Sequence, residues 1–181
     1  MNTTTTGLEP EAVGTPVRYP MVRSGGLFLV LIGSGVVGGT LLARDGLVNQ
    51  PVFFLGLGAA VLSLLGARWV SFGRGTPLQL FALFGALGLQ AVLLVAAARV
   101  LGPMSGDRLW YRTMVIVGLH FLPMSVSFGP RMLWLGTACI ANGALGFLAP
   151  AVPFGLVAFV DGILKITVGA WMFLTKLEHA I

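Results

Sequence analysis

Long apolar runs separated by short polar breaks dominate this chain. A helix needs about 20 apolar residues to cross the hydrocarbon layer of a membrane, and six runs meet that requirement. They cover residues 25–43, 51–70, 77–98, 109–128, 131–148 and 153–174. The pattern predicts an all-α fold, an integral membrane bundle of six transmembrane helices.

The breaks between the runs contain residues that start or stop helices. Pro51 and Pro77 stand at the first positions of two runs, where the missing N–H of proline is tolerated. Gly129 and Pro130 separate the fourth run from the fifth. Because the connections are short, we expect consecutive helices to pack as antiparallel neighbours.

The two ends of the chain are polar. Residues 1–24 are rich in threonine, proline and charge, and they predict a disordered N-terminal tail. Residues 176–181 form a short C-terminal tail. The run at 25–43 begins late and is longer than the apolar stretch of a signal peptide, so we interpret it as the first transmembrane helix.

Composition agrees with a lipid-facing surface. Of the 181 residues, 56% are hydrophobic and only 9% are charged, whereas a soluble domain carries about 25% charged residues. The net charge is +5, but the basic residues stand singly near the ends of the runs. Nucleic acid binding needs clustered basic residues, so this spacing argues against it and favours contacts with lipid headgroups.

The distribution of arginine and lysine predicts the orientation in the membrane. Six spans place both termini on the same side. That side would carry Arg18, Arg23, Arg68, Arg74, Arg131 and Lys176, and the other side Arg44, Arg99, Arg108 and Arg112. The excess predicts that both termini are cytoplasmic in a cell (inner) membrane protein.

Glycine is unusually frequent, with 26 residues. Helices in lipid associate through close packing, which small residues permit. Gly35 and Gly39 form a G-x-x-x-G pattern in the first predicted helix. We interpret them as a helix–helix contact within the chain; the alternative is a homo-oligomer formed through this face. The lipid bilayer is the other expected partner.

Asp161 and Lys165 lie near the middle of the sixth predicted span. Their spacing of four places them on one helix face, with the acid first, which suits an ion pair. A single charge at the bilayer centre costs roughly 2.5–3.5 kcal/mol on insertion scales. The pair is therefore a candidate functional site. The alternative is a self-neutralising pair that holds the helix packing.

His120 lies in the middle of the fourth predicted span. Pro123 follows it by three residues and removes a backbone hydrogen bond, which predicts a kink. Histidine titrates near physiological pH and suits proton transfer. The alternative is a neutral histidine that donates a hydrogen bond across the bundle.

Gln90 and Asn142 are mid-span amides in the third and fifth predicted helices, and each needs hydrogen-bond partners in a medium without water. The simpler interpretation is a hydrogen bond between helices. If they converge with His120 and Asp161, they line a midplane polar cavity. Cys139, the single cysteine, is expected to be a small core residue.

Several signatures of catalysis and cofactor binding are absent from the sequence. It contains no H-E-x-x-H, G-x-S-x-G, phosphate-binding G-x-x-x-x-G-K-[ST] or C-x-x-C pattern. We therefore expect no enzyme activity, no cofactor and no metal site.

The segment 117–124, which reads Val-Gly-Leu-His-Phe-Leu-Pro-Met, resembles a His-Phe-Leu-Pro segment of an uncharacterised family of small multi-pass bacterial membrane proteins. The resemblance implies an inner-membrane location and assigns no activity.

Two functions are therefore open from the sequence. The first is a small transporter or channel-like protein with a midplane site of His120, Asp161 and Lys165. The second is a non-catalytic accessory, assembly or stress-response membrane protein whose polar residues are structural.

Overall fold

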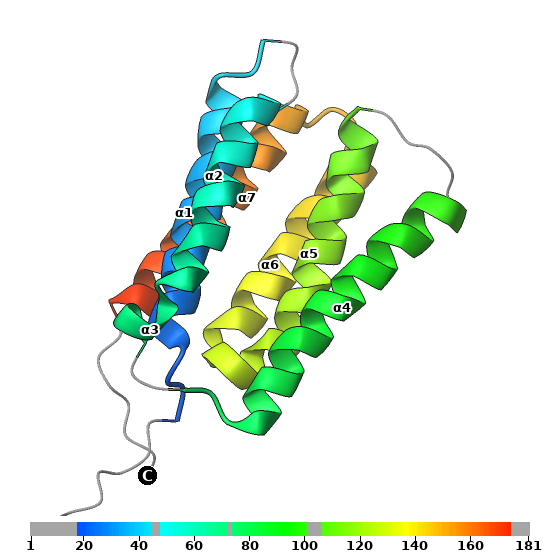
Figure 1. The fold of residues 1–181 in the computed structure, drawn as a ribbon. Coiled ribbons are helices and arrows are strands. Elements are labelled where there is room, and N and C mark those ends of the chain that lie inside the picture. Colours follow the sequence, from blue (N-terminus) through cyan, green and yellow to red (C-terminus); the bar gives the residue numbers. More distant parts are fainter. Residues whose placement is uncertain (1–17, 45–47, 72–73, 101–105, 175–181) are drawn as a thin grey trace, which may run out of the picture.

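A computed structural model describes residues 18–44, 48–71, 74–100 and 106–174, and all regular structure in these ranges is helical (Figure 1). The helices are α1 (Val22–Leu41), α2 (Gln50–Leu65), α3 (Ala67–Val70), α4 (Pro77–Val100), α5 (Asp107–Phe128), α6 (Arg131–Leu148) and α7 (Phe154–Phe173). Helix α3 is a single turn of 4 residues.

Most helices lie close to the runs expected from sequence. Helix α6 coincides with the run at 131–148, and α4, α5 and α7 differ from theirs only at the ends. Helix α1 begins at Val22, before the expected start at residue 25, so the predicted N-terminal tail is shorter than 1–24. Of the two predicted tails, residues 1–17 and 176–181 lie outside the described residues.

The run at 51–70 is not one helix. It is divided at Gly66 into α2 and α3. Helix α2 has 16 residues and measures about 24 Å at 1.5 Å per residue, which is shorter than a membrane core of about 30 Å.

Four described helices are long and apolar enough to cross a membrane, namely α1, α4, α5 and α7. Helix α2 is too short, and α6 begins with Arg131 and carries Asn142, which lower its mean hydropathy. Length and composition therefore indicate a membrane location with four candidate spans, where the sequence predicted six.

Side chains just before two helices explain where those helices begin. The Oδ1 of Asn49 accepts a hydrogen bond from the backbone N–H of Val52, which caps α2. Thr76 and Gln79 form a reciprocal capping box at α4: each side chain accepts a hydrogen bond from the other residue's backbone N–H.

Helix α1 packs most extensively against α7, and glycines make that contact possible. A β-carbon on Gly33 would lie 2.8 Å from the carbonyl oxygen of Gly162, and one on Gly169 would lie 2.7 Å from that of Gly26. The two helices are antiparallel, and the glycines on each recur at a spacing of seven, which keeps them on one face. The backbones therefore touch directly, as in close-packed helices in lipid.

The same arrangement joins α5 to α6. A β-carbon on Gly118 would lie 2.8 Å from the carbonyl oxygen of Gly136, and one on Gly143 would lie 3.0 Å from that of Tyr111. Helices α5 and α6 are thus a second antiparallel pair with direct backbone contact.

Gly35 and Gly39 face α2. A β-carbon on Gly35 would lie 2.8 Å from the Cα of Gly56, and one on Gly39 would lie 2.7 Å from the Cγ1 of Val48. The G-x-x-x-G face is therefore occupied within the chain, as the contact interpretation expected. These two glycines do not offer a free surface for a homo-oligomer in this structure.

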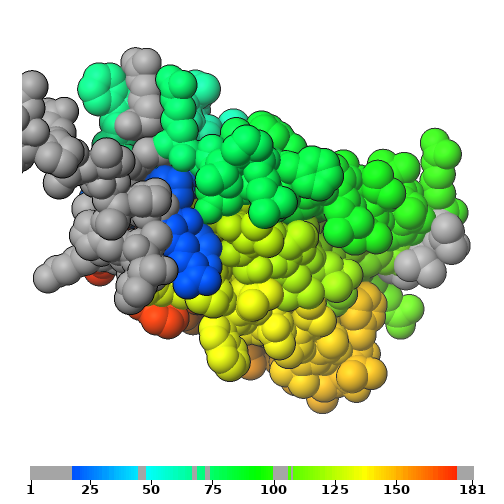
Figure 2. Space-filling view, turned by 90° about the horizontal axis from the view of Figure 1, so that it is seen from below, coloured from blue at the N-terminus to red at the C-terminus, as the bar shows by residue number. Residues whose placement is uncertain are grey.

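The helices form two groups that meet along α6 and α7 (Figure 1). Helix α1 lies between α2 and α7, and α5 lies between α4 and α6. The contact between α4 and α5 leaves most of α4 uncovered, and Figure 2 shows its green surface open along one face. The Nε of Arg23 donates a hydrogen bond to the carbonyl of Phe173, which ties the start of α1 to the end of α7.

Candidate functional site

Asp161 and Lys165 form an ion pair on α7. The Nζ of Lys165 donates to the Oδ2 of Asp161, across one helical turn. Each residue is only 3% exposed, because Gly162, next to Asp161, lets α1 approach closely. Two opposite charges so close together neutralise each other, which reduces the cost of placing either one away from water.

Helix α6 contributes two polar contacts to α7. The Nζ of Lys165 lies 3.9 Å from the Sγ of Cys139, and the Nδ2 of Asn142 donates to the carbonyl of Val157 at 2.8 Å. Cys139 is fully buried, which confirms the expectation of a core residue. Asn142 therefore forms a hydrogen bond between two helices, which was the simpler of the two roles considered for it.

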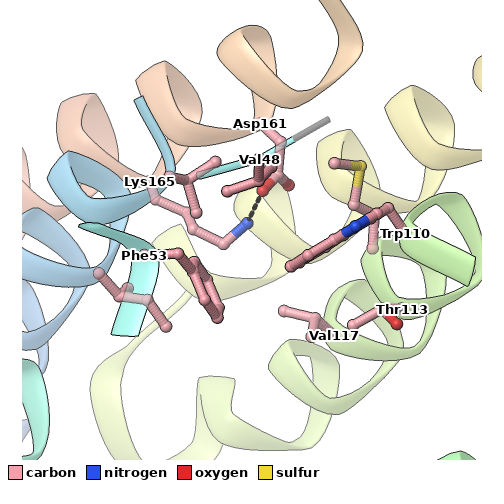
Figure 3. Close-up of a pocket in the computed structure, with 10 residues that line it drawn as sticks. Val48, Phe53, Trp110, Thr113, Val117, Asp161 and Lys165 are labelled. Atoms are coloured by element: carbon pink, nitrogen blue, oxygen red, sulfur yellow. Dashed lines mark hydrogen bonds and ion pairs between the residues drawn. The ribbon is translucent and has the colours of Figure 1, made fainter. Parts of the chain in front are cut away.

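A cavity of about 70 Å³ lies beside the ion pair. Asp161 and Lys165 form one side of it, and Figure 3 shows Phe53, Trp110 and Val117 on the opposite side. The apolar lining also includes Ile32, Val36 and Met114. The site is therefore an apolar chamber in which one wall carries a carboxylate and an ammonium group.

Two aromatic side chains, one from α2 and one from α5, line the chamber. The rings of Phe53 and Trp110 meet edge to face, with centroids 5.4 Å apart and planes at 84°, a favourable geometry for aromatic pairs. Neither residue was predicted from the sequence to belong to the site. Trp110 stands near the start of α5, a place typical of a headgroup anchor, and only the packing of α2 shows its second role.

One oxygen of Asp161 has no partner. Its Oδ1 is buried and makes no hydrogen bond to any described residue, whereas Oδ2 is bonded to Lys165. A buried carboxylate oxygen without a donor costs free energy. Asp161 also belongs to the lining of the chamber.

His120 is on α5 and is 5% exposed. Its ring interacts with the backbone of Val117, one turn earlier, and with the charge of Lys165. Its Nδ1 makes no hydrogen bond of standard geometry to the described residues. Helix α5 continues through Pro123 to Phe128. His120 therefore lies near the ion pair without lining the chamber.

Gln90 does not join this group. It is partly buried on α4, and α4 packs against α5 rather than α7. The four polar residues that were expected to converge therefore do so only in part. Asp161 lies on α7, Asn142 bonds to the backbone of that helix, and His120 lies near the ion pair. Gln90 lies apart from them on α4.

One feature of the sequence indicates that Cys139 faces a neighbouring helix. Cys139 precedes Asn142 by three residues, which places both on one face of a helix. An amide that needs a partner indicates that this face points to a neighbouring helix. Both residues indeed face α7.

Among the described residues, no three His, Cys, Asp or Glu side chains lie together as a metal ion would require. No curated protein and no solved structure matches the chain. A profile described as "Family of unknown function (DUF6609)" matches residues 12–181, nearly the whole sequence. An uncharacterised family is also what the His-Phe-Leu-Pro segment implied. The chain belongs to the family of unknown function DUF6609.

Proposed function

We propose that this protein is a small transporter or channel-like protein whose solute enters the chamber beside Asp161 and Lys165. The observation that carries the proposal is the buried, unpartnered Oδ1 of Asp161, a residue of the chamber lining. A chain that only needed a stable core would gain from a partner for this oxygen. In a binding site, such an acceptor forms its hydrogen bond with the ligand instead.

The proposed protein crosses the membrane six times, with α2 and α6 in addition to the four candidate spans. Three features support this topology: α2 is followed directly by α3, α6 is buried against α5, and the antiparallel pairs alternate in direction. Charges within such a bundle are costly in lipid and usually mark a pathway for ions or solutes.

In the proposed orientation, both termini face the cytoplasm of a bacterial inner membrane. Described arginines at the end where α1 begins are Arg18, Arg23, Arg74 and Arg131, and those at the other end are Arg44, Arg99, Arg108 and Arg112. In the proposed six-span topology, Arg68 and Lys176 belong to the same side as the first group. An excess of positive charge favours the cytoplasmic side.

The proposed mechanism couples protonation to rearrangement. Asp161 or His120 gains or loses a proton, and α5 adjusts at Pro123, where one backbone hydrogen bond of the helix is missing. Lys165 bonds to Asp161, and His120 lies near this pair, so a change in the charge of one group affects the others.

Proton flux through reconstituted protein tests this function. The full chain is placed in liposomes that contain a trapped pH-sensitive dye, and a pH gradient or a potassium diffusion potential is imposed. We expect flux above that of empty liposomes, loss of flux in Asp161→Asn, and retention in Asn142→Ala, which removes a contact outside the chamber. Flux equal to that of empty liposomes, or unchanged flux in Asp161→Asn, contradicts the proposal.

A second function is favoured by one observation. Lys165, Cys139 and Asn142 all connect α6 with α7, which is what a purely structural polar cluster does. In that case the protein is an accessory or assembly factor. Stable co-purification with a larger membrane complex, together with the absence of flux, supports this second function.

A further inference from the structure

The chamber has a chemical character that narrows the class of solute. Its unpartnered acceptor is a carboxylate oxygen of Asp161, and two aromatic rings stand opposite. Besides Lys165 and Thr113, the remaining lining residues have aliphatic or thioether side chains. A carboxylate binds a charged N–H donor more strongly than a neutral donor. Aromatic rings attract cations as well, so the walls suit an organic cation that donates a hydrogen bond.

A metal cation fits this chamber poorly. Hard cations require several oxygen ligands, and the lining offers the carboxylate of Asp161 and the hydroxyl of Thr113. That hydroxyl already donates to the carbonyl of Leu109 at 2.9 Å. An ammonium group needs fewer oxygens, since each N–H forms its own hydrogen bond.

The volume limits the size of the cation. A water molecule occupies about 30 Å³ in the liquid, so about 70 Å³ holds only a few non-hydrogen atoms. A primary ammonium ion with one or two carbons meets this limit. Its N–H would reach the Oδ1 of Asp161, and its carbons would contact Met114 and Val117.

Charge balance then determines what happens to Lys165. In the empty site one carboxylate faces one ammonium group, and the net charge is zero. A second cation would leave one positive charge without a counterion in a buried place, which is strongly unfavourable. If Lys165 releases its proton to bulk water, a carboxylate, a bound ammonium ion and a neutral amine remain, and the net charge is again zero.

The neighbouring elements do not supply another counterion. The titratable groups near Lys165 are Asp161 on its own helix, Cys139 on α6 and His120 on α5. From α1 and α2, the described residues that line the chamber are apolar, as Ile32, Val36 and Phe53 illustrate. Among the described residues that line the chamber, Asp161 carries the only negative charge.

We propose that the chamber binds a small primary alkylammonium ion at Asp161 and that Lys165 releases one proton when it does so, which would couple cation binding to the proton movement of the proposed function. The inference rests on the proposed function, because it names the solute class of the same site.

Calorimetric titration of the purified full chain in detergent tests this coupling. Ethylammonium chloride is the probe, ethanol is the neutral probe of similar size, and potassium chloride controls for ionic strength. Titrations in two buffers with different ionisation enthalpies count the protons released. We expect ethylammonium to bind with release of about one proton, while ethanol and potassium ions do not bind.

Two variants at one position separate the roles of charge and shape. Lys165→Met keeps the carboxyl group of Asp161 and removes the competing ammonium group, so it should still bind ethylammonium. Lys165→Arg remains protonated, so it should bind ethylammonium more than about tenfold more weakly than the wild type. If Lys165→Met does not fold, the proton count of the wild type still decides.

The outcomes distinguish this inference from the proposed function. Binding of ethanol without binding of ethylammonium overturns the cation site but keeps a solute site. Binding of ethylammonium without proton release overturns the coupling. If neither probe binds, the inference fails, and the proton flux in liposomes decides the proposed function independently.

Discussion

The Nζ of Lys165 on α7 lies 3.9 Å from the Sγ of Cys139 on α6. The lysine therefore touches both its carboxylate partner and the neighbouring helix, and the ion pair is part of the α6–α7 contact. Any opening of this contact must separate Lys165 from Cys139. Since Cys139 is the single cysteine of the chain, its thiol reports on this contact alone.

Maleimide labelling of Cys139 should be slow in the folded protein. The side chain is fully buried, so the reagent reaches it only when α6 and α7 separate. We expect labelling to be more than about tenfold slower than in protein unfolded by a denaturing detergent. The control combines Cys139→Ala with Leu148→Cys, because Leu148 is 83% exposed at the end of α6. Equal rates for the two proteins would show that α6 and α7 separate readily.

Gly33→Ala should destabilise the fold. The added β-carbon would lie within 3.0 Å of the carbonyl oxygen of Gly162 and of Ile166 on α7, and overpacking of this kind costs about 1–3 kcal/mol. The matched control is Gly85→Ala on α4, where a β-carbon meets open space, and its stability should be unchanged or slightly higher. Thermal unfolding in detergent measures both. Equal effects would contradict the direct backbone contact between α1 and α7.

Asn142→Ala should cause a modest loss of stability. It removes the 2.8 Å hydrogen bond to the carbonyl of Val157, and such bonds between membrane helices contribute about 0.6 kcal/mol on average. Thr40→Val is the control, because the hydroxyl of Thr40 bonds only within α1, to the carbonyl of Val36. If chemical unfolding shows the same loss for both variants, Asn142 does not connect α6 to α7.

The sequence predicted where most helices lie because apolar runs and their breaks are local features. Proline, glycine and charge at the run ends located α6 to the residue. The break at Gly66 was missed, since a glycine inside an apolar run is common in membrane helices. Four spans rather than six emerge from length and composition, because α2 is short and α6 carries Arg131 and Asn142.

Which helices pair could not be read from the sequence. Surface and core residues are both apolar in lipid, so periodicity does not identify the buried face. The contact between Gly33 and Gly162 joins helices at opposite ends of the chain, although consecutive helices were the expected neighbours. Phe53 and Trp110 line the chamber only because of how the helices pack. Their place in the site was therefore missed for the same reason.

The candidate site was predictable only where its chemistry is local. The spacing of Asp161 and Lys165 predicted their ion pair, which the structure contains. Gln90 was grouped with them because it is mid-span, but depth in the membrane does not determine which way a helix faces. Its helix, α4, packs against the far side of α5 from the chamber.

The stability of Asp161→Asn, Lys165→Met and the double variant tests most directly whether the pair forms a site or only holds the fold. In each single variant the remaining group can become neutral by exchanging a proton with water. We therefore predict that both single variants fold, that each loses less than about 3 kcal/mol, and that the double variant gains nothing further. A structural pair behaves differently: each single variant loses about 3–5 kcal/mol and the double variant recovers. That second result, measured by thermal unfolding in detergent, would contradict a solute site at Asp161.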